Sequence, residues 1–267
     1  MKVHLIILIL FSSFLFGQNS SFIYDLKYKP NSDSTKTEKV TYYLDVREKE
    51  SLFRSNKFRR SDSLRVKRGT PEGYDTQFNN RQLYVKKNFT SNETKRYVFV
   101  PIVYKTYAID ITDQLDWKIS DEKQMIGSYN CQKAEVNYGG RSWQAWFTTD
   151  IAISDGPYIF KGLPGLIVKI NDEKSDFQFN LVQVKNFNWK ELYPAKIEKM
   201  IAWSDYEKLQ SDFYSDPISA IKPSAIINYD EAGNIVKTDL REMREMMKKH
   251  IRAQNNPIEL NHKVEYK

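Results

Sequence analysis

Apolar and polar residues alternate along most of the chain beyond residue 21, and this pattern predicts a protein built mainly from β-strands. Successive side chains of a strand point to opposite faces, so a period of two indicates a strand with one buried face. Strands are predicted at 22–28, 39–46, 83–89, 95–100, 103–111, 124–138, 141–148, 166–170 and 176–184. A polar segment, residues 30–37, links the first two strands.

Two connections have the composition of tight hairpins. Gly139-Gly140 separates two alternating runs, and paired glycines accept the positive φ angles that two-residue hairpin turns require. Late in the chain, residues 225–229 and 235–237 flank a polar segment and form another predicted hairpin. Both signals favour antiparallel pairing of neighbouring strands.

Two helices are predicted, and both lie in the C-terminal third. Residues 204–214 begin with Ser204 and Glu207 in the spacing of a capping box, and Pro217 follows their end. Residues 239–254 form the second helix, whose apolar face consists of Leu240, Met243, Met247 and Ile251. Many strands followed by helices favour a single α+β domain on an antiparallel sheet.

The first 17 residues have the pattern of a cleavable signal peptide. Met1-Lys2 is a positive start, residues 3–16 are almost wholly apolar, and Gly17 is a small residue suited to cleavage. An apolar run this short does not span a membrane as a helix, which needs about 20 residues. We therefore predict a periplasmic or secreted protein with a signal peptide at 1–17, one domain at 18–267, and no transmembrane span after cleavage.

Charge narrows the choice of partner. The chain has 267 residues, with 41 Lys+Arg against 34 Asp+Glu and a formal charge of +7. Much of the excess lies in a basic segment, residues 54–68, which contains Arg54, Lys57, Arg59, Arg60, Arg65, Lys67 and Arg68. Export argues against nucleic acid and leaves an envelope protein or an anionic lipid surface as its partner. The alternative interpretation is a solvated loop or short helix.

Catalytic motifs are scarce. Beyond the signal peptide the histidines are His250 and His262, and no phosphate-binding loop, dinucleotide fingerprint or Gly-x-Ser-x-Gly elbow is present. Cys131 is the one cysteine, and because unpaired cysteines are among the most buried residues, we expect it in the core. We predict no metal, no cofactor and no catalytic residue by name. Carboxylate-based hydrolysis stays open, since sequence alone does not place carboxylate pairs.

The densest aromatic region is 141–170. A period of two puts Trp143 and Trp146 on opposite faces of one strand, and Tyr158 and Phe160 follow before a turn. Two interpretations stand. The region is either a rigid connection between strands or an aromatic rim that receives an apolar or peptide ligand. In the second case, the candidate ligand-binding residues are Trp143, Trp146, Tyr158 and Phe160.

The turn after these aromatics has a distinctive sequence. Leu163-Pro164-Gly165-Leu166 fits a type II turn, in which Pro164 fixes φ and Gly165 accepts a positive φ. The full string is Gly162, Leu163, Pro164, Gly165, Leu166 and Ile167. This string is the signature of the exported bacterial GLPGLI family, which the chain resembles.

The resemblance extends through Tyr129–Ala134, Arg141–Thr148, Gly156–Tyr158 and Asn255–Leu260. Two positions depart from the family pattern: Ala152 stands where proline is frequent, and Asp155 stands where a larger apolar residue is common. The resemblance implies export and no established biochemical function.

A Trp-bearing strand followed by a Gly-Leu-Pro turn is also similar to exported half-barrel carriers and stress sensors of the LolA/RseB type. There, a curved antiparallel sheet wraps helices and holds an apolar ligand. By this analogy we expect an α+β fold with a curved, mainly antiparallel sheet and helices in the C-terminal third. The expected function is a non-catalytic envelope binding module for a lipid, acyl chain or peptide. The alternatives are a protein–protein module using residues 54–68 and an exported carboxylate-dependent hydrolase.

Overall fold

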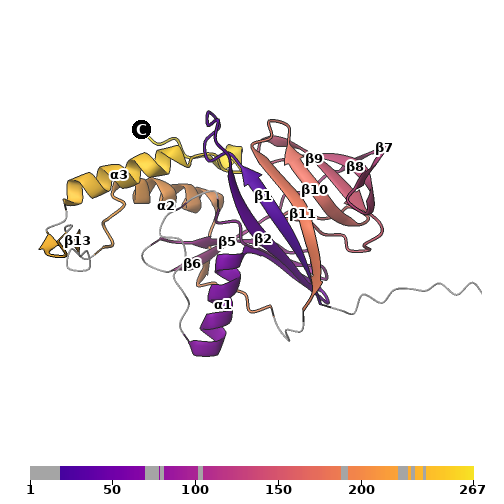
Figure 1. Ribbon diagram of the computed structural model, residues 1–267, viewed down its shortest axis with the longest axis horizontal. Helices are drawn as coiled ribbons and strands as arrows, with labels where there is room; N and C mark the ends of the chain where they lie inside the picture. Colours follow the sequence, from indigo (N-terminus) through magenta and orange to yellow (C-terminus); the bar gives the residue numbers. More distant parts are fainter. Residues whose placement is uncertain are drawn as a thin grey trace, which may run out of the picture.

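One large, open β-sheet forms most of the protein (Figure 1). The computed structural model describes residues 19–69, 78, 81–101, 105–187, 192–221, 228–229, 232–236 and 239–267, so the predicted signal peptide lies outside the described residues. In this part of the chain the sheet has 12 strands in the order β12-β6-β5-β4-β3-β2-β1-β11-β10-β9-β8-β7. Neighbouring strands are antiparallel apart from the β12–β6 pair. The predicted α+β class with a mainly antiparallel sheet is confirmed.

The strands are β1 (Ser20–Tyr28), β2 (Glu38–Arg47), β3 (Glu50–Ser55), β4 (Val85–Asn88), β5 (Thr94–Phe99), β6 (Thr106–Asp110), β7 (Lys118–Ile126), β8 (Tyr129–Tyr138), β9 (Arg141–Thr148), β10 (Leu166–Asp172), β11 (Phe177–Asn186) and β12 (Lys199–Met200). A separate small hairpin consists of β13 (Asn228–Tyr229) and β14 (Ile235–Val236). The described helices are α1 (Asn56–Arg68), α2 (Trp203–Ser215) and α3 (Leu240–Ala253), followed by a 3-10 turn, η2 (Leu260–His262).

The strand predictions needed correction at several places, and the two-residue strand β12 was not predicted at all. The single strand predicted over 124–138 is two strands, β7 and β8, separated by a turn at Gly127, whose φ is 59°. Strand β3 was not predicted, because Leu52 and Phe53 are both buried although they point to opposite faces. A strand covered on both faces shows no alternation of apolar and polar residues.

The helix predictions also needed a correction. Helices α2 and α3 lie where the sequence predicted them, but α1 lies far outside the C-terminal third. The Ser55 side chain caps the N-terminus of α1 by accepting a hydrogen bond from the Phe58 backbone, and Gly69 ends the helix in the left-handed conformation. The basic segment is therefore mostly a helix. Only part of the hairpin predicted at 225–237 falls within the described residues, as β13 and β14.

The N-terminal strand lies at the centre of the sheet. Strand β1 pairs with β2 on one side and with β11, more than 150 residues later, on the other. Figure 1 shows α2 and α3 together beside the β5–β6 end, while β7, β8 and β9 form the opposite end. Among the described residues, no helix is both long and apolar enough to cross a membrane.

The main hydrophobic core lies against one face of the sheet. The connection between β9 and β10, residues 149–165, is here called the Gly-Leu-Pro loop. Its side chains Ile159 and Leu163 belong to the same core cluster as Phe147 of β9 and Ile170 of β10. The loop therefore packs against the face of the sheet that meets the main hydrophobic core.

Candidate functional site

A buried ion pair attaches the Gly-Leu-Pro loop to the sheet. Lys87 of β4 forms an ion pair with Asp155, and both side chains are fully buried. The Lys87 ammonium also donates to the backbone oxygens of Gly156, at 2.8 Å, and Phe160, at 3.5 Å. Burial lowers the pKa of Lys87, while the nearby Asp155 carboxylate opposes that shift. This contact gives Asp155, which departs from the family pattern, a structural role.

The signature turn differs from the predicted type II turn. Gly162 has the positive φ, 96°, whereas Gly165 is absent from the residues with positive φ. Gly165 is required for another reason, because a Cβ atom there would lie 2.0 Å from the Thr148 carbonyl oxygen. The glycine therefore permits a close backbone approach between the loop and the end of β9.

The four aromatic residues predicted as a rim are not at the surface. The exposed fraction is 1 % for Trp143, 8 % for Trp146, and 0 % for both Tyr158 and Phe160. Trp143 and Trp146 belong to different apolar clusters, as their alternation predicts. Cys131 is buried beside Trp146, and burial raises the pKa of its thiol to about 11. An exposed aromatic rim is thus corrected to a packed core, and ligand binding by these residues stays a prediction.

Arg141 anchors the C-terminal segment that shares in the family resemblance. Its guanidinium donates five hydrogen bonds, to Asp172 (2.9 Å), Asp176 (3.1 Å), Asn256 Oδ1 (2.6 Å), the Pro257 oxygen (2.8 Å) and the Ile258 oxygen (3.1 Å). Burial acts to raise the pKa of Asp176, but hydrogen bonds from Lys29 and Arg141 outweigh it and leave the pKa lowered.

Glu259 joins the same segment to the Gly-Leu-Pro loop. Its Oε1 accepts hydrogen bonds from the hydroxyls of Tyr138, at 2.9 Å, and Tyr158, at 2.6 Å. Glu259 is itself buried. Arg141, Tyr158 and Glu259, which belong to the family resemblance, therefore hold the C-terminal segment to the sheet and to the loop.

The basic segment is not one continuous patch. Arg54 is buried, with Asp62 at 2.5 Å and Asp45 at 3.5 Å. Arg59 also contacts Asp45, at 3.0 Å, and Arg65 donates to the Pro194 oxygen, at 2.6 Å. The members classed as exposed are Lys57, Arg60, Lys67 and Arg68. The sequence analysis did not predict that Asp45 neutralises Arg54 and Arg59, because Asp45 lies outside the basic segment, in β2.

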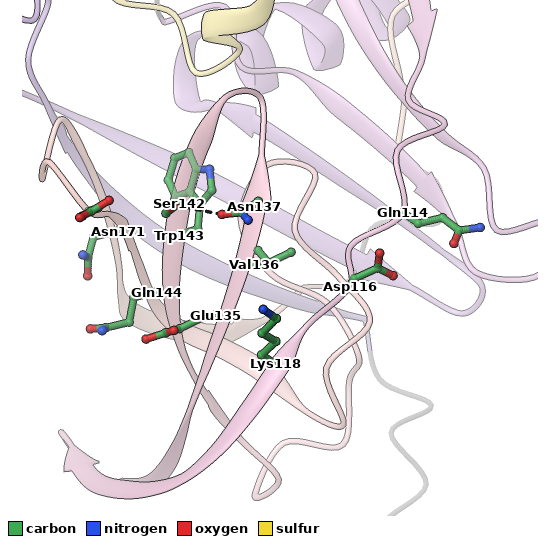
Figure 2. A pocket seen from close by; sticks show the side chains of 11 residues that line it. Gln114, Asp116, Lys118, Glu135, Val136, Asn137, Ser142, Trp143, Gln144 and Asn171 are labelled. Carbon is green, nitrogen blue, oxygen red and sulfur yellow. Dashed lines mark hydrogen bonds between the residues drawn. The ribbon is translucent and has the colours of Figure 1, made fainter.

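An open groove lies near the end of the sheet formed by β7, β8 and β9 (Figure 2). It has a volume of about 660 Å³ and is lined by three segments: residues 114–118, the β8–β9 hairpin and the end of β10. The strand register explains the convergence, because Glu135 lies opposite both Lys118 and Gln144, and Gln144 lies opposite Asn171. Directly opposed residues of antiparallel strands share a face, so these four form a polar row across the sheet.

A second hollow continues the groove. It has a volume of about 670 Å³, and both hollows are lined by Gln114 and Asp116, so they lie next to each other. We call the two together the acidic groove. Its lining includes six carboxylates, Glu93, Asp110, Asp113, Asp116, Glu135 and Glu173, against two lysines, Lys118 and Lys161. The groove is therefore negative on a chain whose formal charge is +7.

Two of these carboxylates have cationic partners. Glu93 lies 3.5 Å from Lys95, and Glu135 lies 3.2 Å from Lys133. The other four, Asp110, Asp113, Asp116 and Glu173, are exposed and form no side-chain ion pair with the described residues. Lys161, by contrast, is occupied by hydrogen bonds to Asn92. The groove thus presents unpaired negative charge to solvent.

The sequence contained part of this signal. Asp110, Asp113 and Asp116 recur every third residue, a spacing visible without a structure. Their convergence with Glu135 and Glu173 depends on how β7, β8 and β10 are arranged, which the sequence does not reveal. Among the residues described, no group of three or more His, Cys, Asp or Glu side chains could hold a metal ion.

Comparisons with known proteins found one matching family model and several structures with a similar fold. A family model described as Porph_ging, a protein of unknown function, matches residues 135–169, from β8 through the Gly-Leu-Pro loop into β10. No curated protein matches the chain.

Two solved structures of PNGF-II, in the C2 and P21 space groups, are similar to the chain. Each has a TM-score of 0.52 and 16% sequence identity, and the match covers 73% of this chain and 33% of that chain. The chain thus spans about a third of the length of the structures it matches. At this identity the likeness shows a shared fold, so the chain has the fold of one part of PNGF-II.

Proposed function

We propose that the protein is an exported, non-catalytic binding module whose acidic groove takes a positively charged peptide segment. The observation that carries the proposal is the excess of carboxylates along a groove of two adjacent hollows, on a chain whose formal charge is +7. Low-dielectric walls lined by one sign of charge concentrate ligands of the opposite sign and speed their association.

The chemistry of the lining favours a peptide over a lipid or an acyl chain. Gln114, Asn137, Ser142 and Gln144 offer hydrogen-bond donors and acceptors, which suit the amide groups of a peptide backbone. An acyl chain gains free energy by leaving water for an apolar surface, whereas more of this groove's surface is polar than apolar. Of the four aromatic residues first considered for an apolar ligand, Trp143 borders the groove but is only 1 % exposed, and the other three are buried outside its lining.

Export is supported by residues 1–17 and by the resemblance to the exported GLPGLI family, and it has its own test. Protein isolated from the envelope or medium of the producing cells should begin at Gln18 when its N-terminus is sequenced. A mature protein that retains Met1 and fractionates with the cytoplasm would contradict export without affecting the groove.

The binding test compares two triple variants with the same change in charge. Asp113→Asn, Asp116→Asn and Glu173→Gln neutralise the groove, whereas Asp33→Asn, Glu242→Gln and Glu245→Gln neutralise exposed carboxylates elsewhere. The probe is an extended peptide rich in Lys and Arg, and affinity is measured by calorimetry at two salt concentrations. We expect the groove variant to bind the peptide at least about tenfold more weakly than the wild type, because it removes three charge contacts.

The remaining outcomes of this test are also informative. Equal binding by both variants would show that only net charge matters and would overturn the groove as the site. Binding to vesicles of anionic lipid that is lost in Lys57→Gln, Arg60→Gln, Lys67→Gln and Arg68→Gln would instead support the basic segment. Lipid extracted from purified protein would support the apolar ligand.

A carboxylate-dependent hydrolase is the second candidate, because Asp116, Glu135 and Glu173 line the same hollow. Mass spectrometry of the peptide probe after incubation separates the two functions. Peptide cleavage that disappears in Asp116→Asn or Glu173→Gln would favour the hydrolase, and an intact peptide favours the binding module.

A further inference from the structure

Strand β7 forms one edge of the 12-stranded sheet. It pairs with β8 on one side, and no described strand lies on its other side. All nine of its residues are exposed or partly exposed. An edge strand presents unpaired backbone N–H and C=O groups, which form a template for another strand.

One face of β7 has a self-complementary pattern. Ile119 lies opposite Ala134 and Lys123 lies opposite Gln132, so Ile119 and Lys123 share a face. That face reads, in order, Ile119, Asp121, Lys123 and Met125. An antiparallel copy centred on Glu122 places Ile119 opposite Met125 and Asp121 opposite Lys123, and two-fold symmetry makes each contact twice.

The side chains of this row are exposed to solvent. Ile119 is 48 % exposed and Met125 is 64 % exposed, which makes them two of the large apolar side chains left at the surface. Asp121 and Lys123 are exposed and form no ion pair with the described residues. Opposed apolar pairs and opposed unlike charges each stabilise an antiparallel strand pair.

Glu122 lies on the symmetry axis of such a pair, where two copies of it would meet. Its carboxylate lies 3.0 Å from the Lys133 ammonium of β8, so each copy brings a compensating positive charge. The pairing of β7 with β8 is irregular between Ile119 and Lys123. The irregular part therefore includes the axis and Asp121, while Lys123 to Ile126 keep a regular register with β8.

We propose that β7 is the contact of a homodimer, in which a second copy adds its own β7 antiparallel and continues the sheet. The occupant is a second copy because the apolar–acidic–basic–apolar order matches itself when it is reversed. A single strand pair is a small interface, so self-association is weak and depends on protein concentration.

Charge reversal tests the register directly. Asp121→Lys alone and Lys123→Asp alone each turn both unlike-charge contacts of the dimer into like-charge contacts, so each should weaken self-association by about tenfold. An equimolar mixture of the two variants restores both contacts in a heterodimer, and the double variant Asp121→Lys with Lys123→Asp restores them in a homodimer. Analytical ultracentrifugation over a wide concentration range measures all four samples.

Matched controls are Asp33→Lys and Lys36→Asp in the polar segment 30–37, where both residues are exposed. They should leave self-association unchanged, and circular dichroism should show the same fold in every sample. A wild-type chain that stays monomeric at all concentrations would overturn the proposal. So would single variants that associate like the wild type, or a mixture that fails to recover. Capture of an unrelated strand at β7, with no self-association, would also contradict the homodimer.

Discussion

Arg141 uses all five of its N–H donors on acceptors in β10, in the following turn and in the C-terminal segment. Both the side chain and its carboxylate partners are almost fully buried. No other residue type offers five donors in a planar fork. At the residue scale, stability therefore depends on a few buried charged groups as well as on apolar packing.

Replacement of Arg141 tests this dependence. Arg141→Met should lower the free energy of unfolding by about 3–5 kcal/mol, because it leaves Asp172 buried without its counter-charge and Asp176 with Lys29 alone. Lys29→Met is the matched control, since Lys29 pairs with Asp176 from a more exposed position and should cost about 1 kcal/mol or less. Urea unfolding measures both. Equal losses in the two variants would contradict the assigned role of Arg141.

Gly165 shows what sequence can and cannot tell about a single residue. The Leu163–Leu166 string correctly indicated a change of chain direction, which is a bend at residues 163–165, but the type II turn and the reason for the glycine were wrong. A turn type depends only on neighbouring residues, whereas the contact that Gly165 makes is with Thr148, in the preceding strand. Contacts of this kind depend on the tertiary fold and are invisible in a local pattern.

A Gly165→Ala substitution should therefore be severe. The added methyl group meets a backbone carbonyl that cannot move aside without shifting β9, so we expect a loss of about 3 kcal/mol or more. Gly69→Asn is the control, because Gly69 is left-handed with open space around it and asparagine tolerates that conformation. Thermal unfolding of the two variants compares them. A mild effect of Gly165→Ala would show that the loop can retreat from β9.

At the element scale, alternation predicted strands well wherever one face of the sheet meets the core. It failed for β3, which is covered on both faces, and for β7, which is covered on neither. Helix α1 was obscured by its charge, because only Phe58, Ser61 and Asp62 are buried along it. Elements with no contrast between their two faces give no periodic signal, whatever their structure.

The charges of the basic segment should separate into two groups. Arg54→Met removes the fully buried counter-charge of Asp62 and Asp45 and should lower the free energy of unfolding by about 3–5 kcal/mol. Lys67→Gln with Arg68→Gln, in the last turn of α1, should cost about 1 kcal/mol or less. Chemical unfolding of the two variants measures the difference. Similar losses of unfolding free energy would contradict the separation into buried and exposed charges.

At the scale of the whole molecule, the fold class was predictable and the acidic groove was not. The order of strands and helices is a property of the sequence, so it indicated an α+β fold directly. The groove arises where residues 110–118 cross beside β8, β9 and β10, and that crossing depends on strand order. The spacing of Asp110, Asp113 and Asp116 suggested only one wall of it.

Buried tyrosines predict how the whole molecule responds to alkali. Burial raises the pKa of Tyr24, Tyr84, Tyr138 and Tyr158 well above the ordinary value, and raises that of Tyr97 to about 12. Above about pH 10 the unfolded chain loses these protons while the folded chain keeps them, so stability falls as pH rises. Each of these tyrosines lowers the free energy of unfolding by up to about 1.4 kcal/mol per pH unit.

The five together should therefore unfold the protein cooperatively near pH 11. Tyrosinate absorbance and far-ultraviolet circular dichroism should change at the same pH, because ionisation of these side chains waits for unfolding. Absorbance that follows the titration of free tyrosine while the β-sheet spectrum persists would show that the rings are accessible.

The central position of β1 has a consequence for the order of events after synthesis. Its partner β11 lies more than 150 residues further along the chain, and Arg141 takes acceptors from residues 256–258. Contacts so distant in sequence close large loops and make folding slow. A chain still being synthesised has β2 early but lacks β11, so one side of β1 stays unpaired until late. Such a chain cannot complete the sheet before most of it has been made, so the fold closes as a late, long-range event.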